Sequence, residues 1–436
     1  MQNQDCQEWI TQALENIPWE ASPILAAMRK HYGEAFMQRL RDFMLLPLLG
    51  YRSIRDAEED LPYGRDGLYE WMKLQSFNWL DMIEEITFAL FFYWLEYGQR
   101  HDPSTLSRNR IRMIFDHTLI QKWGRTVADI ANLYDHVSGS YQWSHKLVVC
   151  LVTVGEGRVR FPLAVRLWSR TAEPHRTHSE LGAEICDKVR QAAQARGLSL
   201  ASVRVLGDKD YCTKAIRDAV HRAGMTLWSS PQPMQKFTWR GQTITKADLE
   251  SDAFHMPWRQ SSQLRGNHAL LEGRYARFVV EHADLGTCVL AVEEYVETVS
   301  HKRKRRVYLC TNPQADAVRV IQEAKKKRWP IEPHFRESKQ TGSYGCYQGT
   351  GHTSLEAHYA CAVLRSILLG ELLKLSRRRP SLSQGQRMDN TSAVAWYLSR
   401  NVRFDTLYKS ESFLRLRRGS LKRPPETPPQ EAKTAA

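Results

Sequence analysis

The order of apolar runs between residues 108 and 230 constrains the fold of this chain more than any other feature of its sequence. The hydrophobic spacing predicts three strands, a helix, a strand, a helix and a strand, at residues 110–115, 146–154, 158–168, 178–196, 202–206, 213–223 and 225–228, respectively. The first three strands are expected to form a meander. The alternation of helices and strands after them is typical of an α/β domain.

This order, β-β-β-α-β-α-β, is that of a ribonuclease-H-like α/β domain, which we expect over residues 106–230 and, after an interruption, over 306–376. Residues 1–105 carry apolar positions at helical spacing and are expected to form an all-α N-terminal domain. Residues 231–305 are strand-rich and are expected to form a β-rich insertion with its own small sheet. Residues 377–436 are expected to form a C-terminal helical segment followed by a disordered, basic and proline-rich tail.

Charge and hydropathy narrow the class of partner. Lys and Arg outnumber Asp and Glu by 62 to 48, and the formal net charge of +14 attracts polyanions, so nucleic acid is the first partner to consider. The longest apolar run, 88–95, is bracketed by glutamates and is too short to cross a membrane. There is no secretory signal, and the eight cysteines form no CxxC pair, so we expect a reduced cytoplasmic protein without a zinc site.

A possible helix-turn-helix lies in the N-terminal segment. Ser53 is placed to cap one short helix, Pro62 and Gly64 mark a turn, and Asp66 is placed to cap a second helix. The alternative is an ordinary helical hairpin, which we favour because such turns are common in all-α bundles.

Two aspartates follow strand-like runs and are candidate metal ligands. Asp116 comes directly after the apolar residues 113–115, and Asp208 follows residues 203–206 in the same way. Carboxylates at the ends of neighbouring strands can share a divalent cation such as magnesium. An aspartate after a strand is also a common turn former, and Asp210 is a rival for the second position.

A third carboxylate lies in the segment 328–339. Helical spacing places Arg328, Glu332, Arg336 and Lys339 on one stripe, so that Glu332 could bind metal while the cations meet a phosphodiester backbone. The alternative is a solvated helix face with salt bridges between successive turns.

These residues resemble the Y-R-E-K signature of bacterial insertion-sequence DDE transposases. Arg328, Glu332 and Lys339 match the signature in type and spacing, while Lys325 replaces its tyrosine. Two further motifs are similar to the family's first-acid D-x-T and second-acid D-x-x-Y, at Asp116-His117-Thr118 and Asp208-Lys209-Asp210-Tyr211. The resemblance covers residues 108–370, and a β-rich insertion between the second and third acids is typical of this branch of the family.

The resemblance implies a transposase in which Asp116, Asp208 and Glu332 hold two Mg²⁺ or Mn²⁺ ions. Such an enzyme cleaves double-stranded DNA at the ends of the insertion sequence and joins them to target DNA, in a cut-and-paste reaction carried out by a homodimer on paired ends. The N-terminal domain would bind those ends, and the segment 325–339 would supply the DNA-contacting cations Lys325, Arg328, Arg336 and Lys339. Because Lys325 replaces the tyrosine, the sequence leaves the use of hairpinned ends open.

Several alternatives remain at this stage. A transposase-derived DNA-binding protein that no longer cuts, or a nuclease of the same fold without strand transfer, would share most of these features. The basic run 302–306 could lie along DNA or form a solvated loop. A second metal site at Asp135, His136 and His145 and base stacking by Trp239, Trp258 or Trp329 are weaker hypotheses.

Overall fold

The protein was examined as a computed structural model. The structure describes residues 2–51, 53–100, 110–122, 126–155, 157, 159–264, 273–296, 302–340, 344–345, 351–378, 390–402, 404 and 407. The tail predicted to be disordered lies outside these residues.

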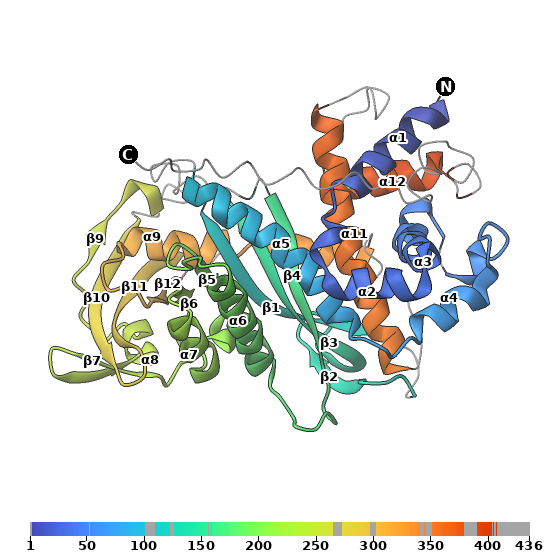
Figure 1. Ribbon diagram of the computed structural model, residues 1–436. Coiled ribbons are helices and arrows are strands. Elements are labelled where there is room, and N and C mark those ends of the chain that lie inside the picture. The colour runs from blue at the N-terminus through green and yellow to red at the C-terminus, as the bar shows by residue number, and fades with distance from the viewer. Residues whose placement is uncertain are drawn as a thin grey trace, which may run out of the picture.

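The described residues form a mixed α/β fold around one twelve-stranded sheet (Figure 1). The strands are β1 (Ile111–Gln121), β2 (Ala131–Asp135), β3 (Ser140–Val154), β4 (Val159–Trp168), β5 (Arg204–Leu206), β6 (Thr226–Ser229), β7 (Lys236–Trp239), β8 (Gln242–Thr245), β9 (Arg259–Gln260), β10 (Arg274–His282), β11 (Gly286–Val296) and β12 (Arg303–Cys310). They run across the sheet in the order β2-β3-β1-β5-β6-β12-β11-β10-β7-β8, with β4 paired to β3 and β9 to β10.

The centre of the sheet is parallel and its two sides are antiparallel. β5 pairs with β1 on one side and with β6 on the other, both in parallel, whereas β1, β3 and β4 form an antiparallel meander. Parallel strands need helical crossovers, and α6 (His178–Ala195) and α7 (Lys214–Arg222) supply them. The meander and the following alternation of helices and strands are therefore as predicted, with β2 as an additional hairpin strand.

Local sequence explains where α6 begins and ends. Thr177 accepts a hydrogen bond from the backbone of Glu180, and the Glu180 carboxylate accepts one in return from the backbone of Thr177, which forms a capping box. At the other end Gly197 has φ +64°, a conformation that a residue without Cβ adopts easily, and the helix stops there.

Two different sets of helices cover the two faces of the sheet. The odd positions Met113 and Phe115 of β1 belong to the apolar cluster that includes residues of α6 and α7. Ile114, which points the other way, belongs to a second cluster with Leu206 of β5 and Ile331 of α10. The helical segments on this second face are α9 (Ala317–Gln322), the π-helical turn η7 (Glu323–Lys327) and α10 (Ile331–Gln340).

Helices from both ends of the chain pack together at one end of the sheet (Figure 1). They are α1 (Gln2–Glu15), α2 (Pro23–Tyr32), α3 (Glu34–Leu45), α4 (Gly64–Met72), α5 (Trp79–Arg100), α11 (His352–Arg378) and α12 (Thr391–Asn401). Buried Arg365 of α11 donates to the carbonyl oxygens of Phe43 and Met44, and Trp9 of α1 donates to that of Leu372. No helix among the described residues is long and apolar enough to cross a membrane.

Three details differ from the sequence-based expectations. The helix expected after Ser53 is only a 3-10 turn, η3 (Arg55–Ala57), so the segment before α4 is not a helix-turn-helix of two full helices. The β-rich insertion has no separate sheet, because β12 pairs with β6 and carries β11 and β10 into the main sheet. The basic run 302–306 lies largely in strand β12 instead of a loop, since the register with β11 continues through Arg303.

Candidate active site

Register places Asp116 and Asp208 side by side. Ile114 of β1 is the parallel partner of Leu206 of β5, and each aspartate lies two residues further along its own strand direction. The pairing of β1 with β5 ends at this point, whereas β1 continues against β3, where Asp116 is opposite Val149. The prediction that the strand ends before Asp116 is therefore wrong, because β1 continues to Gln121.

The turn after β5 depends on a glycine. A Cβ atom at Gly207 would lie 2.7 Å from Cβ of Tyr211, closer than side chains approach, so the chain can fold back here only without one. Asp208 then begins the 3-10 turn η5 (Lys209–Tyr211), where its Oδ1 accepts a hydrogen bond of 2.9 Å from the backbone of Asp210. Asp210 lies within this turn, and Asp208 is the carboxylate at the register position of Asp116.

Glu332 reaches the same face from the helix that follows Pro330. Its neighbour Ile331 is fully buried in the apolar cluster of Ile114 and Leu206, which fixes the first turn of α10 over β1. Arg328 lies in the turn before α10 and joins two of the acids, with Nη1 3.1 Å from Oδ2 of Asp116 and Nη2 3.4 Å from Oε1 of Glu332. The predicted stripe is thus not one helix, although Arg328 and Glu332 keep the expected ion pair.

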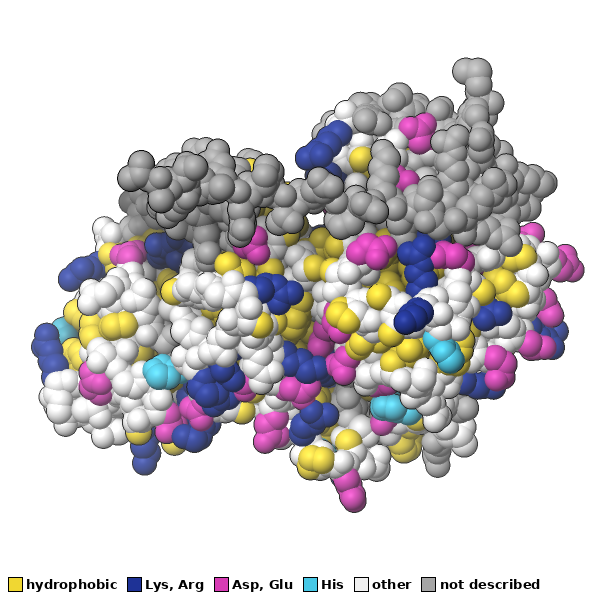
Figure 2. All heavy atoms as spheres, in the orientation of Figure 1, with side chains coloured by type: hydrophobic (Ala, Val, Ile, Leu, Met, Phe, Trp, Pro, Cys, Tyr) yellow, Lys and Arg dark blue, Asp and Glu magenta, His cyan; other side chains and the backbone are white. Residues whose placement is uncertain are grey.

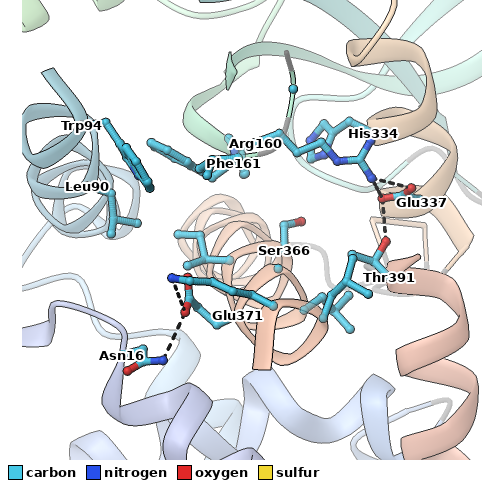
Figure 3. Close-up of a pocket in the computed structure, with 18 of the residues that line it drawn as sticks. Asn16, Leu90, Trp94, Arg160, Phe161, His334, Glu337, Ser366, Glu371 and Thr391 are labelled. Atoms are coloured by element: carbon cyan, nitrogen blue, oxygen red, sulfur yellow. Dashed lines mark hydrogen bonds and ion pairs between the residues drawn. The ribbon is translucent and has the colours of Figure 1, made fainter. Parts of the chain in front are cut away.

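The position of α10 is also fixed from its far side (Figure 3). Both carboxylate oxygens of Glu337 lie 2.6 Å from Nη2 of Arg160 on β4, and Oε2 accepts a hydrogen bond of 2.7 Å from Thr391 of α12. These residues line a cavity of about 860 Å³ between α5, β4, α10 and α11. The helix that carries Glu332 is therefore bound to the meander and to the C-terminal helices.

A second cluster of charges joins β1, β5 and the segment η7 that leads to Glu332. Glu323 in η7 has side-chain exposure of 5% and lies 2.6 Å from Nε of Arg112 on β1 and 2.6 Å from Nη1 of Arg204 on β5. Arg112 and Arg204 are register partners, four residues before Asp116 and Asp208. β1, β5 and the segment that leads to Glu332 are thus cross-linked by an Arg-Glu-Arg cluster beneath the acids.

Burial and mutual repulsion perturb the aspartates. Burial raises the pKa of Asp116 to about 6, and the Asp208 carboxylate adds to this effect, while Arg328 lowers it and Glu332 raises it. Burial likewise raises the pKa of Asp208, with the neighbouring Asp210 as the next cause. The carboxylates of Asp208 and Glu332 are therefore close enough to Asp116 to raise its pKa. The single positive charge of Arg328 does not balance the charges of three carboxylates.

A cationic cavity of about 690 Å³ opens beside Asp208 and Arg328. Among the described residues, seven cations and three acids line it: Lys246, Arg303, Lys304, Arg305, Arg306, Lys325, Arg328, Asp208, Glu250 and Asp252. The basic run of β12 thus lines the same cavity as Asp208 and Arg328. On the face shown in Figure 2, Lys and Arg side chains are interspersed with Asp and Glu side chains.

The other three cations predicted to contact DNA, Lys325, Arg336 and Lys339, lie in η7 and α10. Lys325 in η7 binds the Glu293 carboxylate of β11 at 2.8 and 3.0 Å, so its charge is partly neutralised. Arg336 and Lys339 are exposed on α10, and desolvation lowers the pKa of Lys339 while Asp135 of β2 raises it. Of the four predicted DNA-contacting cations, Arg328 is the one that contacts the acids, and Lys325 lines the same cavity as Asp208.

The hypothesis of a metal site at Asp135, His136 and His145 is not supported. His145 is buried and both ring nitrogens have partners, Oη of Tyr359 and the carbonyl of Ala128, each at 2.8 Å. The tryptophans differ among themselves. Trp239 packs against Phe254 and Phe278, and Trp258 lies under Arg274 and Arg305, whereas Trp329 is 55% exposed.

Sequence reasoning did not find the Arg-Glu-Arg cluster, the role of Glu337, or a group formed by His117, His178 and Asp210. Each joins residues from elements far apart in the chain, and no local spacing marks them. No protein-family model matches the chain. A search of curated proteins also gave no match.

Proposed function

We propose that this protein is a DDE transposase, a metal-dependent enzyme that cuts double-stranded DNA at the ends of an insertion sequence and transfers the cut strands to target DNA. The observation that carries the proposal is the alignment of Asp116 and Asp208 on parallel strands, with Glu332 delivered to the same face by α10. The order of β1, β3, β4, α6, β5, α7 and β6 supports a ribonuclease-H-like core for this site.

The donor set fits magnesium or manganese. Three carboxylates supply hard oxygen ligands. Within the described part of the chain, no imidazole or thiolate group, which would favour softer metals, hydrogen-bonds to the carboxylates of Asp116, Asp208 or Glu332. Two such ions would activate a water or a DNA 3′-hydroxyl and neutralise the departing oxygen. Arg328 contacts Asp116 and Glu332 where such ions would bind, so its guanidinium must turn toward the substrate phosphate when they enter.

The cationic cavity suits the DNA backbone. A phosphodiester strand that entered beside Arg303, Lys304 and Arg306 would lie against positive charge and approach Asp208 and Arg328 at the inner wall. In the first step the oxygen of water bonds to phosphorus and the bond to the departing 3′-oxygen breaks. In the second step the oxygen of that 3′-hydroxyl bonds to a phosphorus of the target DNA, and the bond from this phosphorus to the target's own 3′-oxygen breaks, which leaves a 3′-hydroxyl on the target strand. Arg328 would stabilise the negative charge that develops on phosphorus in both.

The proposal is tested with labelled duplexes that carry the DNA flanking the coding sequence, searched beforehand for short inverted repeats. We expect Mg²⁺-dependent nicking at the repeat and joining to a plasmid, with both reactions lost in EDTA. Asp116→Asn, Asp208→Asn and Glu332→Gln should each abolish cleavage and retain binding to the duplex. The matched control, Glu70→Gln, changes an exposed carboxylate of α4 that pairs with Lys73 and should retain cleavage.

The alternatives give different outcomes. Cleavage by Glu332→Gln at the wild-type rate would overturn the assignment of the third acid. Cleavage without joining would identify a nuclease, and sequence-specific binding without metal-dependent cleavage would identify a DNA-binding protein that no longer cuts. Analytical ultracentrifugation with the repeat duplex tests the expected homodimer on paired ends.

A further inference from the structure

Three metal-ligating side chains meet on the other side of β1 from the acids. His117 of β1, His178 at the start of α6 and Asp210 of η5 each offer one ligand atom, and these atoms all lie within 4.8 Å of one another. No other group of this kind occurs among the described residues.

This group shares the turn η5 with the acidic site, and its Asp210 lies near Asp208, but its histidine on β1 lies on the other face of that strand. Side chains alternate along a strand, so His117 points away from the face occupied by Asp116. The ring of His117 lies 4.9 Å from that of His178 and 6.2 Å from that of Tyr211, and Tyr211 belongs to the apolar cluster beneath α6. Glu332 and α10 cover the opposite face.

Polar atoms without partners collect at this place. Nδ1 of His117, Nε2 of His178 and Oη of Tyr211 are buried and have no hydrogen-bond partner within the described part of the chain. A buried polar atom without a partner costs free energy, and several in one place indicate a missing water or ion. Two imidazole nitrogens without hydrogen-bond partners and a carboxylate are groups that can bind a transition metal.

We propose that His117, His178 and Asp210 bind a transition-metal ion of the Zn²⁺ type. Imidazole nitrogen suits zinc and its neighbours in the transition series, whereas magnesium prefers an all-oxygen set, so the site would discriminate against Mg²⁺. Three protein ligands leave one or more positions for water, which could bond to the Tyr211 hydroxyl. This proposal does not depend on the proposed transposase activity.

The ion would join three separate elements. It would join β1 to η5 and to the first turn of α6. Of these elements, β1 contains Asp116 and η5 begins directly after Asp208. Binding that occurs only in the folded state stabilises it, so the ion should raise the temperature of unfolding.

Lys146 is the neighbour that opposes metal binding. Its Nζ lies 3.2 Å from Nδ1 of His178, which identifies Nε2 as the ring nitrogen left for the metal. A ring that binds metal through Nε2 keeps its proton on Nδ1, so Lys146 must turn away or act as a neutral acceptor. An ammonium group this close also repels a divalent cation. Removing the charge at position 146 should therefore strengthen binding.

The test measures Zn²⁺ binding to the full chain by equilibrium dialysis with metal analysis, and the spectrum of Co²⁺ as a probe of the ligand set. We expect one tightly bound ion per chain, visible Co²⁺ absorption of a low-coordinate site, and a rise in melting temperature with Zn²⁺ but not with the same concentration of Mg²⁺. His117→Gln and His178→Gln should each weaken binding at least ~10-fold, since each removes one of three ligands.

Controls separate this site from others in the chain. Glu332→Gln, which alters the acidic site, and His221→Gln, which changes an exposed histidine of α7, should leave Zn²⁺ affinity unchanged. Lys146→Met should increase it. The proposal is overturned if Zn²⁺ does not bind stoichiometrically, if both histidine variants bind as tightly as the wild type, or if Glu332→Gln abolishes binding. Melting curves recorded in EDTA establish that each variant is folded.

Discussion

Arg328 is the cation that contacts two of the three acids of the candidate site. It is the only cation of the segment 325–339 found in contact with the acids, and it bridges Asp116 and Glu332 from a turn outside the helix. Exposed cations further along α10 lack such contacts. Residues that look equivalent on a helical wheel are therefore different in the fold.

Arg328→Ala is expected to reduce the rate of DNA cleavage more than Lys339→Ala does. Arg328 is placed to meet charge developing at the scissile phosphate, where loss of one donor costs about 100- to 1,000-fold in rate. Lys339 can contribute only to binding of the backbone. Single-turnover cleavage at saturating enzyme measures the chemical step, with duplex affinity measured in parallel. Equal rates for the two variants would contradict this division.

Buried His334 predicts a loss of stability in acid. It is 4% exposed, and burial lowers its pKa from 6.5 to about 3. Between these values the unfolded chain binds a proton that the folded chain does not, so stability falls as pH decreases through this window. The loss approaches about 1.4 kcal/mol per pH unit for one such group.

Urea unfolding of the wild type and His334→Gln at pH 7, 6, 5 and 4 measures this effect. The variant keeps a polar group near Ser338 and should lose stability less steeply than the wild type as pH falls. His221→Gln, at an exposed position, should follow the wild-type curve. Parallel curves for His334→Gln and wild type would show that His334 takes up a proton in the folded state.

At the scale of elements, β1, β5 and the segment from η7 to α10 act as one unit. Two layers of charge cross-link them: Glu323 with Arg112 and Arg204 inside the fold, and the acids with Arg328 at its edge. The π-helical turn lies between the layers and adds a residue to the normal helical repeat, which is a feature often found next to functional sites. The third acid is thus positioned by contacts that begin nine residues before it in the chain.

Glu323→Gln is expected to destabilise the fold severely. It leaves Arg112 and Arg204 buried without a countercharge, and removal of one partner from a buried ion pair costs about 3–5 kcal/mol. Chemical denaturation of the variant measures the loss. Glu70→Gln removes a partner from the exposed pair with Lys73 and should change stability by less than about 1 kcal/mol. A comparable small loss for Glu323→Gln would mean that water reaches the two arginines.

At the scale of the whole molecule, one sheet connects the strands beside the acids to the strand β12 that carries the cations. Asp116, Asp208 and Glu332 lie on β1, after β5 and on α10, respectively. The strands expected to be a separate insertion extend the same sheet and bring the cations of β12 beside Asp208. The helices from the two chain ends pack against the meander at the opposite end. DNA bound at the cavity would therefore contact residues from both sides of the insertion.

The salt dependence of DNA binding tests this arrangement. Each phosphate neutralised on duplex DNA contributes about 0.9 to the slope of log affinity against log salt concentration. Arg303→Gln should lower the slope by about this amount if the strand lies along DNA. Arg222→Gln removes the same charge from α7 on the other face of the sheet and is expected to leave the slope unchanged. A slope unaffected by Arg303→Gln would place DNA away from the cavity.

The sequence by itself determined which segments form helices and strands through the central domain. It also singled out Asp116 and Asp208 beside two apolar strand runs, although Asp116 lies within β1 and not after it. Apolar periodicity and caps act over a few residues, so 178–196, 213–223 and the strands around them could be read locally. The same local pattern placed Glu332 just after Pro330. It also suggested a separate insertion sheet, because periodicity says nothing about which strand is the neighbour of which.

Only the tertiary structure decided which distant side chains meet. The pairing of β12 with β6, the contact of Arg328 with Asp116, the burial of Glu323 between two arginines and the group of His117, His178 and Asp210 all depend on packing between elements remote in the chain. Their energies come from burial and from charges brought together at short range, which exist only after the sheet and its helices have assembled. For that reason the three acids could be proposed as candidates from the sequence, whereas the side chains that contact them could not be predicted.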